Sequence, residues 1–299
     1  MQRRTFVRTS SLTLAALALL TNRTLANFLQ DPWKIKMLTK EIGIFTEKGG
    51  TIVFMLSKDG IVVVDSQFPE QSKHLIDDLK KKTDKPFRLL VNTHHHGDHS
   101  GGNIAFKGLV QHVLAHSNSK LNQEKVAIEK KTEEQQLYPD QTFGTTWCEK
   151  IGKEKLCLHY FGLAHTNGDA LVHFQHANIL HMGDLVFNRR HPFVDRTAGA
   201  NIRSWINVIE KTVKTFDKKT IFVCGHAAEG YDVLANRADV QLFGDYLQTL
   251  LSFVENSIKD GKTKEDLLKI TVLPGAPEWK TEGLSRPLGA AYDELTSKL

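Results

Sequence analysis

Short runs in which apolar residues alternate with polar ones, or follow one another directly, predict β-strands in eight places. The predicted strands cover residues 35–45, 51–57, 61–65, 88–92, 154–161, 170–174, 179–181 and 220–224. Helices are predicted after Asp98 and over residues 70–82, 202–216, 236–257 and 264–268. The turn at Lys58-Asp59-Gly60 joins the second and third strands in a hairpin. Strands and helices therefore interleave, which predicts an α/β fold with a mixed sheet.

The composition is that of an ordinary globular enzyme, because 40% of the 299 residues are hydrophobic and 24% are charged. These fractions exclude a disordered, collagen-like or multi-span membrane protein. The chain has 3 cysteines, too few for a small domain that depends on disulfides. The sequence contains no obvious repeat or linker and no glycine pattern typical of dinucleotide or P-loop binding. One continuous domain is therefore expected.

The N-terminus has the pattern of an export signal. A basic segment, residues 2–8, precedes an apolar run at residues 11–20 that is too short to span a bilayer, and small residues follow near Ala26. Paired Arg3 and Arg4 resemble the twin-arginine type of signal. The alternative, an amphipathic helix, is disfavoured because residues 3–26 contain no acidic residue. We therefore predict a signal peptide over residues 1–26, a mature domain over residues 27–299, and a periplasmic location.

Most of the positive charge belongs to this signal. Loss of its four arginines would reduce the formal net charge from +5 to +1. The mature part has no stripe of lysine and arginine interleaved with aromatic residues, so nucleic acid is excluded as a partner. A small-molecule substrate is expected instead, with no stable membrane span after signal cleavage and with no particular oligomeric state predicted.

The segment at residues 91–102 carries the clearest chemistry. In an extended turn after a strand, His94 and His96 point to one side and can meet one metal ion, while Asp98 and His99 lie within reach of a second. Imidazoles and carboxylates suit zinc, and a hydrolytic zinc site keeps one position open for water. A histidine tag or surface tract is disfavoured, because Gly-Asp interrupts this run and an apolar strand precedes it.

Further ligand candidates follow later strands, each in a segment that also contains a glycine: His165, Asp184 and His226. Enzymes built on sheets carry their chemistry at such strand ends. Each residue taken alone has a structural explanation, as a loop, turn or helix-start residue. Their common placement favours one shared site.

This pattern resembles the metallo-β-lactamase superfamily over about residues 35–226. The matching positions are His94, His96, Asp98, His99, His165, Asp184 and His226, with Asp65 matching an early aspartate at a strand end that supports the ligands. The resemblance implies a four-layer αβ/βα sandwich of two mixed β-sheets flanked by helices. It places the active site at one edge of the sandwich.

The resemblance also implies two zinc ions per chain. The implied ligands are His94, His96 and His165 for the first ion, Asp98, His99 and His226 for the second, and Asp184 as the bridge between them. Hydroxyacylglutathione hydrolase and lactonase branches of the superfamily also have a bridging aspartate at the position of Asp184. The best-known β-lactamases have a cysteine at this position. This departure weakens the expectation of β-lactam specificity but leaves metal binding unaffected.

The expected activity is hydrolysis of a cyclic amide, ester or lactone by a metal-bridging hydroxide, with Asp98 both binding metal and orienting the nucleophile. A thioesterase resembling hydroxyacylglutathione hydrolase is the alternative, although the export signal and the absence of a glutathione-binding basic pattern disfavour it. An iron oxidoreductase of the same fold is disfavoured because no redox module is appended. A non-catalytic zinc-binding protein is the remaining class.

Four further residues have weaker assignments. Arg189 and Arg190 are candidates for binding a substrate carboxylate, or are exposed loop arginines. If Gly152 and Lys153 form a two-residue turn, Cys148 faces Cys157 at a non-hydrogen-bonded strand pair with Cα atoms about 4.5 Å apart. Both a disulfide and reduced strand cysteines fit this pairing.

Overall fold

The computed structural model describes residues 33–280 and 282–297, and its larger compact unit begins at Ile35. All the metal-ligand candidates fall within this unit. The export signal predicted over residues 1–26 lies outside the described residues and stays a prediction. None of the helices in the described part combines the length and the apolar content that crossing a bilayer requires.

The first sheet has seven strands in sequential order. They are β1 (Lys34–Met37), β2 (Ile42–Thr46), β3 (Ile52–Ser57), β4 (Gly60–Val64), β5 (Phe87–Asn92), β6 (Val110–His116) and β7 (Gln141–Phe143). Strands β2, β3 and β4 pair antiparallel, whereas β4 to β7 run parallel. The sheet is therefore mixed, as predicted.

The second sheet has six strands in the order β15-β13-β11-β10-β9-β8. They are β8 (Thr146–Ile151), β9 (Glu154–His159), β10 (Leu171–Phe174), β11 (Ile179–His181), β13 (Ile221–Val223) and β15 (Leu234–Ala235). Only β11 and β13 pair in parallel. A separate two-stranded sheet joins β12 (Phe187–Asn188) in parallel to β14 (His226–Ala227).

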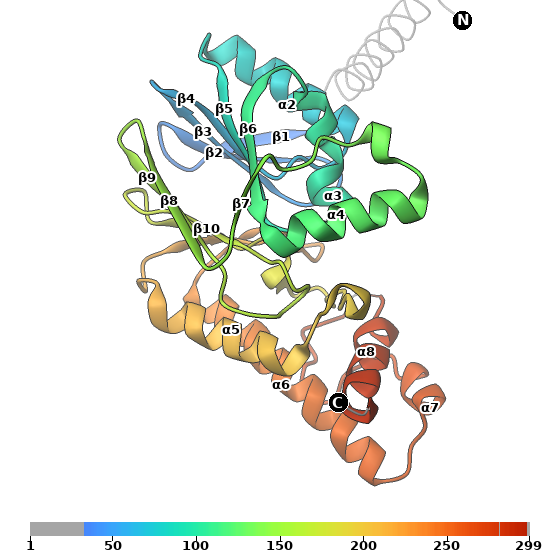
Figure 1. Ribbon diagram of the computed structural model, residues 1–299. Helices are drawn as coiled ribbons and strands as arrows, with labels where there is room; N and C mark the ends of the chain where they lie inside the picture. The colour runs from blue at the N-terminus through green and yellow to red at the C-terminus, as the bar shows by residue number, and fades with distance from the viewer. Residues whose placement is uncertain (1–32, 281, 298–299) are drawn as a thin grey trace, which may run out of the picture. The chain divides into compact units, whose positions relative to one another are not determined.

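The two large sheets pack face to face through one apolar cluster, in which Val62 and Leu89 of the first sheet meet Leu156 and Val172 of the second. A second cluster joins the far face of the second sheet to the helices α5 (Ile202–Thr215), α6 (Arg237–Lys259), α7 (Lys264–Leu268) and α8 (Ser285–Thr296). The helices α2 (Pro69–Lys82), α3 (Gly97–Ser100) and α4 (Ser117–Lys130) lie against the first sheet (Figure 1). The predicted four-layer αβ/βα sandwich is thus confirmed.

Local sequence explains where several of these elements begin and end. All five residues of β4 are buried, because the sheet is covered on both faces, and this run ends directly before Asp65. Helix α2 begins with Pro69, whose missing N–H is not needed in the first turn, and ends with lysines that favour a helix C-terminus. In α6, Asn236 and Asp239 form a capping box.

The prediction of one strand over residues 35–45 is wrong between Leu38 and Glu41. The chain bends there, since Ile42 O accepts hydrogen bonds from the backbone N–H groups of Leu38 and Thr39, and two strands result. The helix predicted after Asp98 instead includes Asp98, because it begins at Gly97, and the chain continues as the 3₁₀ helix η1 (Gly101–Phe106). The strands β6, β7, β12, β14 and β15 and the helices α4 and α8 were not predicted from the sequence, and β8 was expected only through the conditional pairing of Cys148 with Cys157.

Candidate metal centre

The candidate ligands come from chain segments that leave the strands at one edge of the sandwich. His94 and His96 follow β5, Asp98 and His99 lie in the short helix α3, and His165 lies in the connection from β9 to β10. Asp184 lies in the 3₁₀ helix η3 (Gly183–Leu185) after β11, and His226 begins β14. The structure brings all seven residues together in two adjoining clusters.

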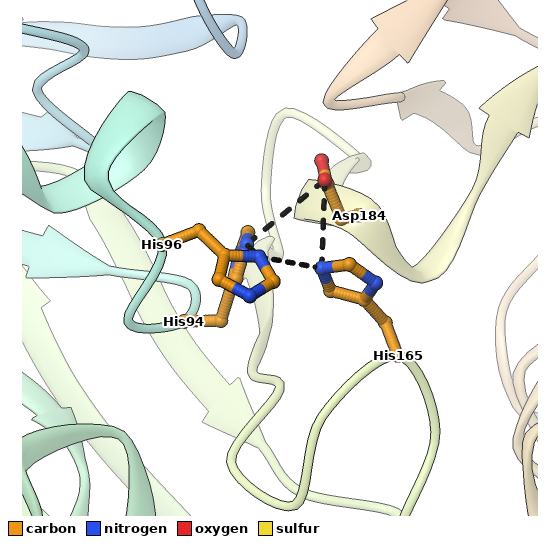
Figure 2. A group of neighbouring side chains, drawn as sticks. All are labelled: His94, His96, His165 and Asp184. Carbon is orange, nitrogen blue, oxygen red and sulfur yellow. Dashed lines mark hydrogen bonds and ion pairs between the residues drawn. The ribbon is translucent and has the colours of Figure 1, made fainter. Parts of the chain in front are cut away.

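The first cluster contains His94, His96, His165 and Asp184, each with one ligand-type atom within 4.8 Å of the others (Figure 2). Nδ1 of His96 lies 3.1 Å from Nε2 of His94 and 2.9 Å from Nε2 of His165. One Nδ1 atom cannot make good hydrogen bonds to both nitrogens when several of these imidazoles are neutral. Nitrogen atoms that converge on a common point in this way fit a bound cation.

The second cluster contains Asp98, His99 and His226. Nε2 of His226 lies 3.1 Å from Oδ2 of Asp98, and Nε2 of His99 lies 3.8 Å from the same oxygen. His99 is fully buried, whereas the Asp98 side chain is 32% exposed. Asp98 is therefore the most accessible group of this cluster.

Asp184, a member of the first cluster, also faces the second cluster. Its Oδ2 lies 3.6 Å from Nε2 of His165 and 4.0 Å from Nε2 of His94. Its Oδ1 lies 3.0 Å from Nε2 of His99 and 3.4 Å from Nε2 of His226, yet receives no well-aligned hydrogen bond from any described residue. One carboxylate thus presents a separate oxygen to each cluster, which is the geometry a bridging ligand requires.

Charge complementarity supports the same interpretation. Burial alone would raise the pKa of Asp184, but the nearby His226 and His99 hold it well below its usual range. Burial alone would lower the pKa of His226, but Asp184 raises it to about 9. Asp184 likewise raises the pKa of the buried His99 well above its usual value. Burial and His96 lower the pKa of His165 to about 3. The surroundings of Asp184 therefore stabilise its negative charge, as a bound metal ion would.

Hydrogen bonds behind the clusters fix the orientation of the rings. Asp65 accepts from His99 Nδ1 at 2.8 Å and from the backbone N–H and hydroxyl of Thr93 at 2.7 and 2.8 Å. The backbone carbonyl of Phe193 accepts from His165 Nδ1 at 2.8 Å. In both rings the Nδ1–H is thereby occupied and Nε2 faces the cluster.

Two glycines, neither of which was assigned a role from the sequence, let the backbone approach the clusters closely. A Cβ atom at Gly225 would lie 2.1 Å from Oδ1 of Asp184, and one at Gly50 would lie 2.1 Å from Cε1 and 2.4 Å from Nε2 of His99. Gly50 comes from the β2–β3 connection, 49 positions from His99 in the sequence. Only the position of Gly225 beside His226 gave a signal in the sequence.

Replacing Gly50 with alanine is expected to displace the ring of His99 and weaken metal binding in the second cluster by about 10- to 100-fold. Competition between the protein and a chromophoric chelator measures this affinity. Gly144→Ala is the matched control, because a Cβ atom there meets nothing within 4 Å. An unchanged affinity in a folded Gly50→Ala variant would show that the close approach to His99 has no role in binding.

Arg189 and Arg190, the candidates for binding a substrate carboxylate, lie in different surroundings. Arg189 is held by Asp239, with Nη2 to Oδ1 at 3.3 Å, and its guanidinium lies 5.5 Å from the ring centroids of both Tyr231 and Trp279. It lines a surface cavity of about 700 Å³ that none of the seven clustered residues lines. Arg190 is exposed. A substrate role for either arginine stays a prediction.

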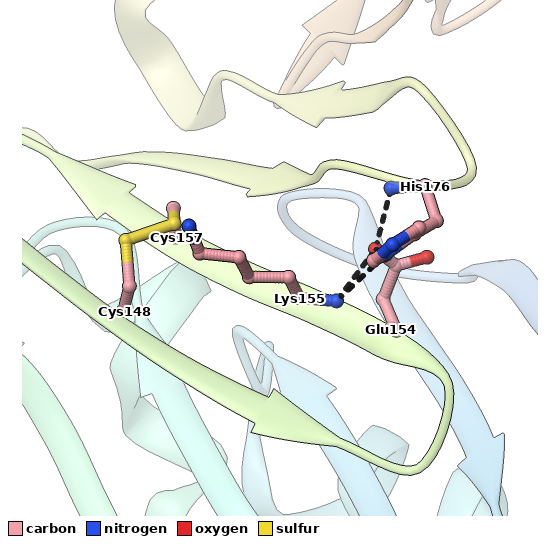
Figure 3. The surroundings of a disulfide bond; sticks show 5 residues. All are labelled: Cys148, Glu154, Lys155, Cys157 and His176. Carbon is pink, nitrogen blue, oxygen red and sulfur yellow. Dashed lines mark hydrogen bonds and ion pairs between the residues drawn. A yellow bond between two sulfur atoms is a disulfide. The ribbon is translucent and has the colours of Figure 1, made fainter.

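Cys148 and Cys157 form a disulfide across the β8–β9 hairpin (Figure 3). They are directly paired in the register, and their Cα atoms lie 4.2 Å apart, close to the spacing expected for a two-residue turn at Gly152 and Lys153. Cys224 is free and buried, and burial raises the pKa of its thiol, so it is unsuited to act as a nucleophile.

The chain belongs to the metallo-β-lactamase superfamily, because the family model described by that name matches residues 46–226. Its relatives are metal-dependent hydrolases, and the histidine and aspartate clusters fit a metal site. The protein is therefore a metal-dependent hydrolase. The family resemblance expected from the sequence is confirmed.

Individual relatives have low sequence identity to this chain, but the similarity extends over more than half of its length. A metallo-beta-lactamase, IND-1, from Chryseobacterium indologenes is 26% identical over 192 residues, which cover 62% of this chain and 76% of that protein. A metallo-beta-lactamase type 2 from Bacillus sp. (strain 170) is 30% identical over 206 residues, covering 66% of this chain and 77% of that protein. The solved structure of a metallo-beta-lactamase from Pontibacter korlensis superposes with a TM-score of 0.62 at 22% identity, covering 72% of this chain and 99% of that one. At this identity the superposition shows the fold alone.

Proposed function

We propose that the protein is an exported, binuclear zinc hydrolase that opens a cyclic amide, ester or lactone. The observation that carries the proposal is the position of Asp184, whose two carboxylate oxygens face two different clusters of metal-ligand residues. A site for a single ion would need only one of these clusters. Imidazole and carboxylate groups in this proportion suit zinc.

The first ion would be held by His94, His96 and His165, and the second by Asp98, His99 and His226, with Asp184 shared. Divalent cations at these positions would lower the pKa of water toward neutrality and withdraw electrons from a substrate carbonyl. The partly exposed carboxylate of Asp98 would accept a hydrogen bond from the attacking water and orient it. No serine or cysteine nucleophile is required, in agreement with the burial of Cys224.

The accessible side of the centre is bounded by an aromatic residue. Phe193 is 45% exposed, and its ring centroid lies 5.4 Å from that of His96 and 6.2 Å from that of His165. A substrate that approaches His96 therefore meets an apolar surface beside the polar centre. This arrangement suits a small molecule in which an apolar substituent lies next to the scissile bond.

The relatives named metallo-beta-lactamase favour a cyclic amide as substrate. Because Asp184 occupies the position at which the best-known β-lactamases have cysteine, lactones and thioesters are also tested as substrates. The zinc-loaded protein should be assayed side by side with a chromogenic cephalosporin, a homoserine lactone, an acyl-thioester and an aryl phosphoester, with the metal-free protein as control. We expect turnover of the cephalosporin or the lactone; turnover of the thioester alone would replace this substrate class with the thioesterase alternative.

Export is part of the proposal. The basic and apolar N-terminal pattern supports it, and so does the disulfide between Cys148 and Cys157, since such bonds persist in oxidising compartments. Cell fractionation tests the location: the protein should appear in the periplasm, and retention in the cytoplasm would contradict export.

A further inference from the structure

A carboxylate outside the seven predicted residues contacts the first cluster. Asp195 is buried and precedes the 3₁₀ helix η4 (Arg196–Ala198). Its Oδ1 accepts hydrogen bonds from the backbone N–H of Thr197 at 3.1 Å, from the Thr197 hydroxyl at 2.5 Å and from the backbone N–H of Ala198 at 3.1 Å. Three donors therefore fix one oxygen of this carboxylate in place.

The other oxygen faces two histidines. Oδ2 of Asp195 lies 2.9 Å from Nε2 of His96 and 3.5 Å from Nε2 of His95. A carboxylate only accepts hydrogen bonds, so Nε2 of His96 carries the proton of this contact. This leaves the lone pair on Nδ1, the atom that faces His94 and His165.

We infer that Asp195 is a positioning residue that sets the tautomer of His96 and thereby the affinity of the first cluster for metal. The inference rests on the proposed metal centre. The alternative role for Asp195 is purely structural, as the cap of η4, because its Oδ1 accepts from two backbone N–H groups there.

The two roles predict opposite rankings for two substitutions. Asparagine caps a helical turn about as well as aspartate, whereas alanine does not. If Asp195 only caps η4, Asp195→Asn is therefore the milder change. If Asp195 sets the tautomer, Asp195→Asn is the more severe change for metal binding. The three donors keep the amide oxygen, so the NH₂ group turns toward Nε2 of His96 and the ring proton moves to Nδ1.

The effect of asparagine is specific to metal binding. In the metal-free protein, a proton on Nδ1 of His96 faces Nε2 of His94 and Nε2 of His165, either of which accepts it when neutral. The metal-free Asp195→Asn variant therefore folds with its hydrogen bonds satisfied. The same proton occupies the position of the lone pair that a metal ion needs.

The test uses the full chain in wild-type, Asp195→Asn and Asp195→Ala forms. Long-range ¹H–¹⁵N NMR of the metal-free proteins reports the tautomer of His96, and competition with a chromophoric chelator reports zinc affinity. We expect Nε2–H in wild type and Nδ1–H in Asp195→Asn. We also expect first-cluster affinity to fall by about 10- to 100-fold in Asp195→Asn and by less in Asp195→Ala.

Asp140→Asn is the matched control. Asp140 also accepts from a histidine, His112 Nδ1 at 2.8 Å, and from a backbone N–H, that of Val113, but lies outside both clusters. Its substitution should leave zinc affinity unchanged. The inference is overturned if His96 keeps Nε2–H in Asp195→Asn, or if Asp195→Ala weakens binding at least as much as Asp195→Asn. Failure of wild type to bind zinc would instead refute the proposed metal centre, while the NMR measurement would still decide the tautomer.

Discussion

Replacing Asp184 with alanine is expected to lower the zinc content from two ions per chain toward one and to reduce kcat/KM by more than about 100-fold. The change removes both oxygens that face the clusters, Oδ2 near His165 and Oδ1 near His99. If two zinc ions still bound to the variant, no carboxylate would lie between them to offset their mutual repulsion. Metal analysis of the purified variant and kinetics on the best substrate of the panel measure the two effects.

Asp232→Ala is the control for this substitution, because Asp232 forms an exposed ion pair with Lys36 at 3.0 Å and belongs to neither cluster. Its zinc content and kcat/KM should match wild type. If Asp184→Ala retained two ions and wild-type activity, Asp184 would not be a bridging ligand. His226→Ala should likewise lower the zinc content toward one, since it removes a residue of the second cluster only.

Replacing Trp205 with alanine is expected to lower the free energy of unfolding by about 3–5 kcal/mol. Trp205 is fully buried in α5, with its ring centroid 5.7 Å from that of His165 and 5.5 Å from that of Phe243. Its indole N–H donates to the carbonyl of Leu185 at 3.0 Å, which secures the residue after Asp184. The substitution therefore opens a cavity beneath the metal centre and leaves a buried carbonyl without its donor.

Urea denaturation of the metal-free variants measures this effect. Trp205→Phe retains most of the buried ring volume and loses mainly the hydrogen bond, so it should destabilise by about 1–2 kcal/mol. A loss below about 1 kcal/mol for Trp205→Ala would mean that the packing under His165 contributes little to the fold.

Elements with a clear apolar pattern were predictable from the sequence, and those without one were not. Strand β4 is continuously apolar, and α5 has a one-sided apolar pattern. Helix α4 buries only Ser119, Gln123 and Ala127, so it has no apolar stripe to detect. Helix α8 contains Pro287 and Gly289, which disfavour a helix, and its burial against the helical layer of the second sheet depends on tertiary structure.

The same distinction applies to the site. The spacing of His94 and His96 after a strand is a local pattern, so sequence alone could place them together. Asp195 and Gly50 lie far from His96 and His99 in the chain, and only the packing of loops at the sheet edge brings them into contact. Their residue types carry no signal for such contacts.

Anomalous X-ray diffraction from a zinc-loaded crystal, at the zinc absorption edge, tests the central claim most directly. We expect two peaks on either side of the Asp184 carboxylate, one among His94, His96 and His165 and the other among Asp98, His99 and His226. A single peak, or a peak outside these clusters, would contradict a binuclear centre in this protein.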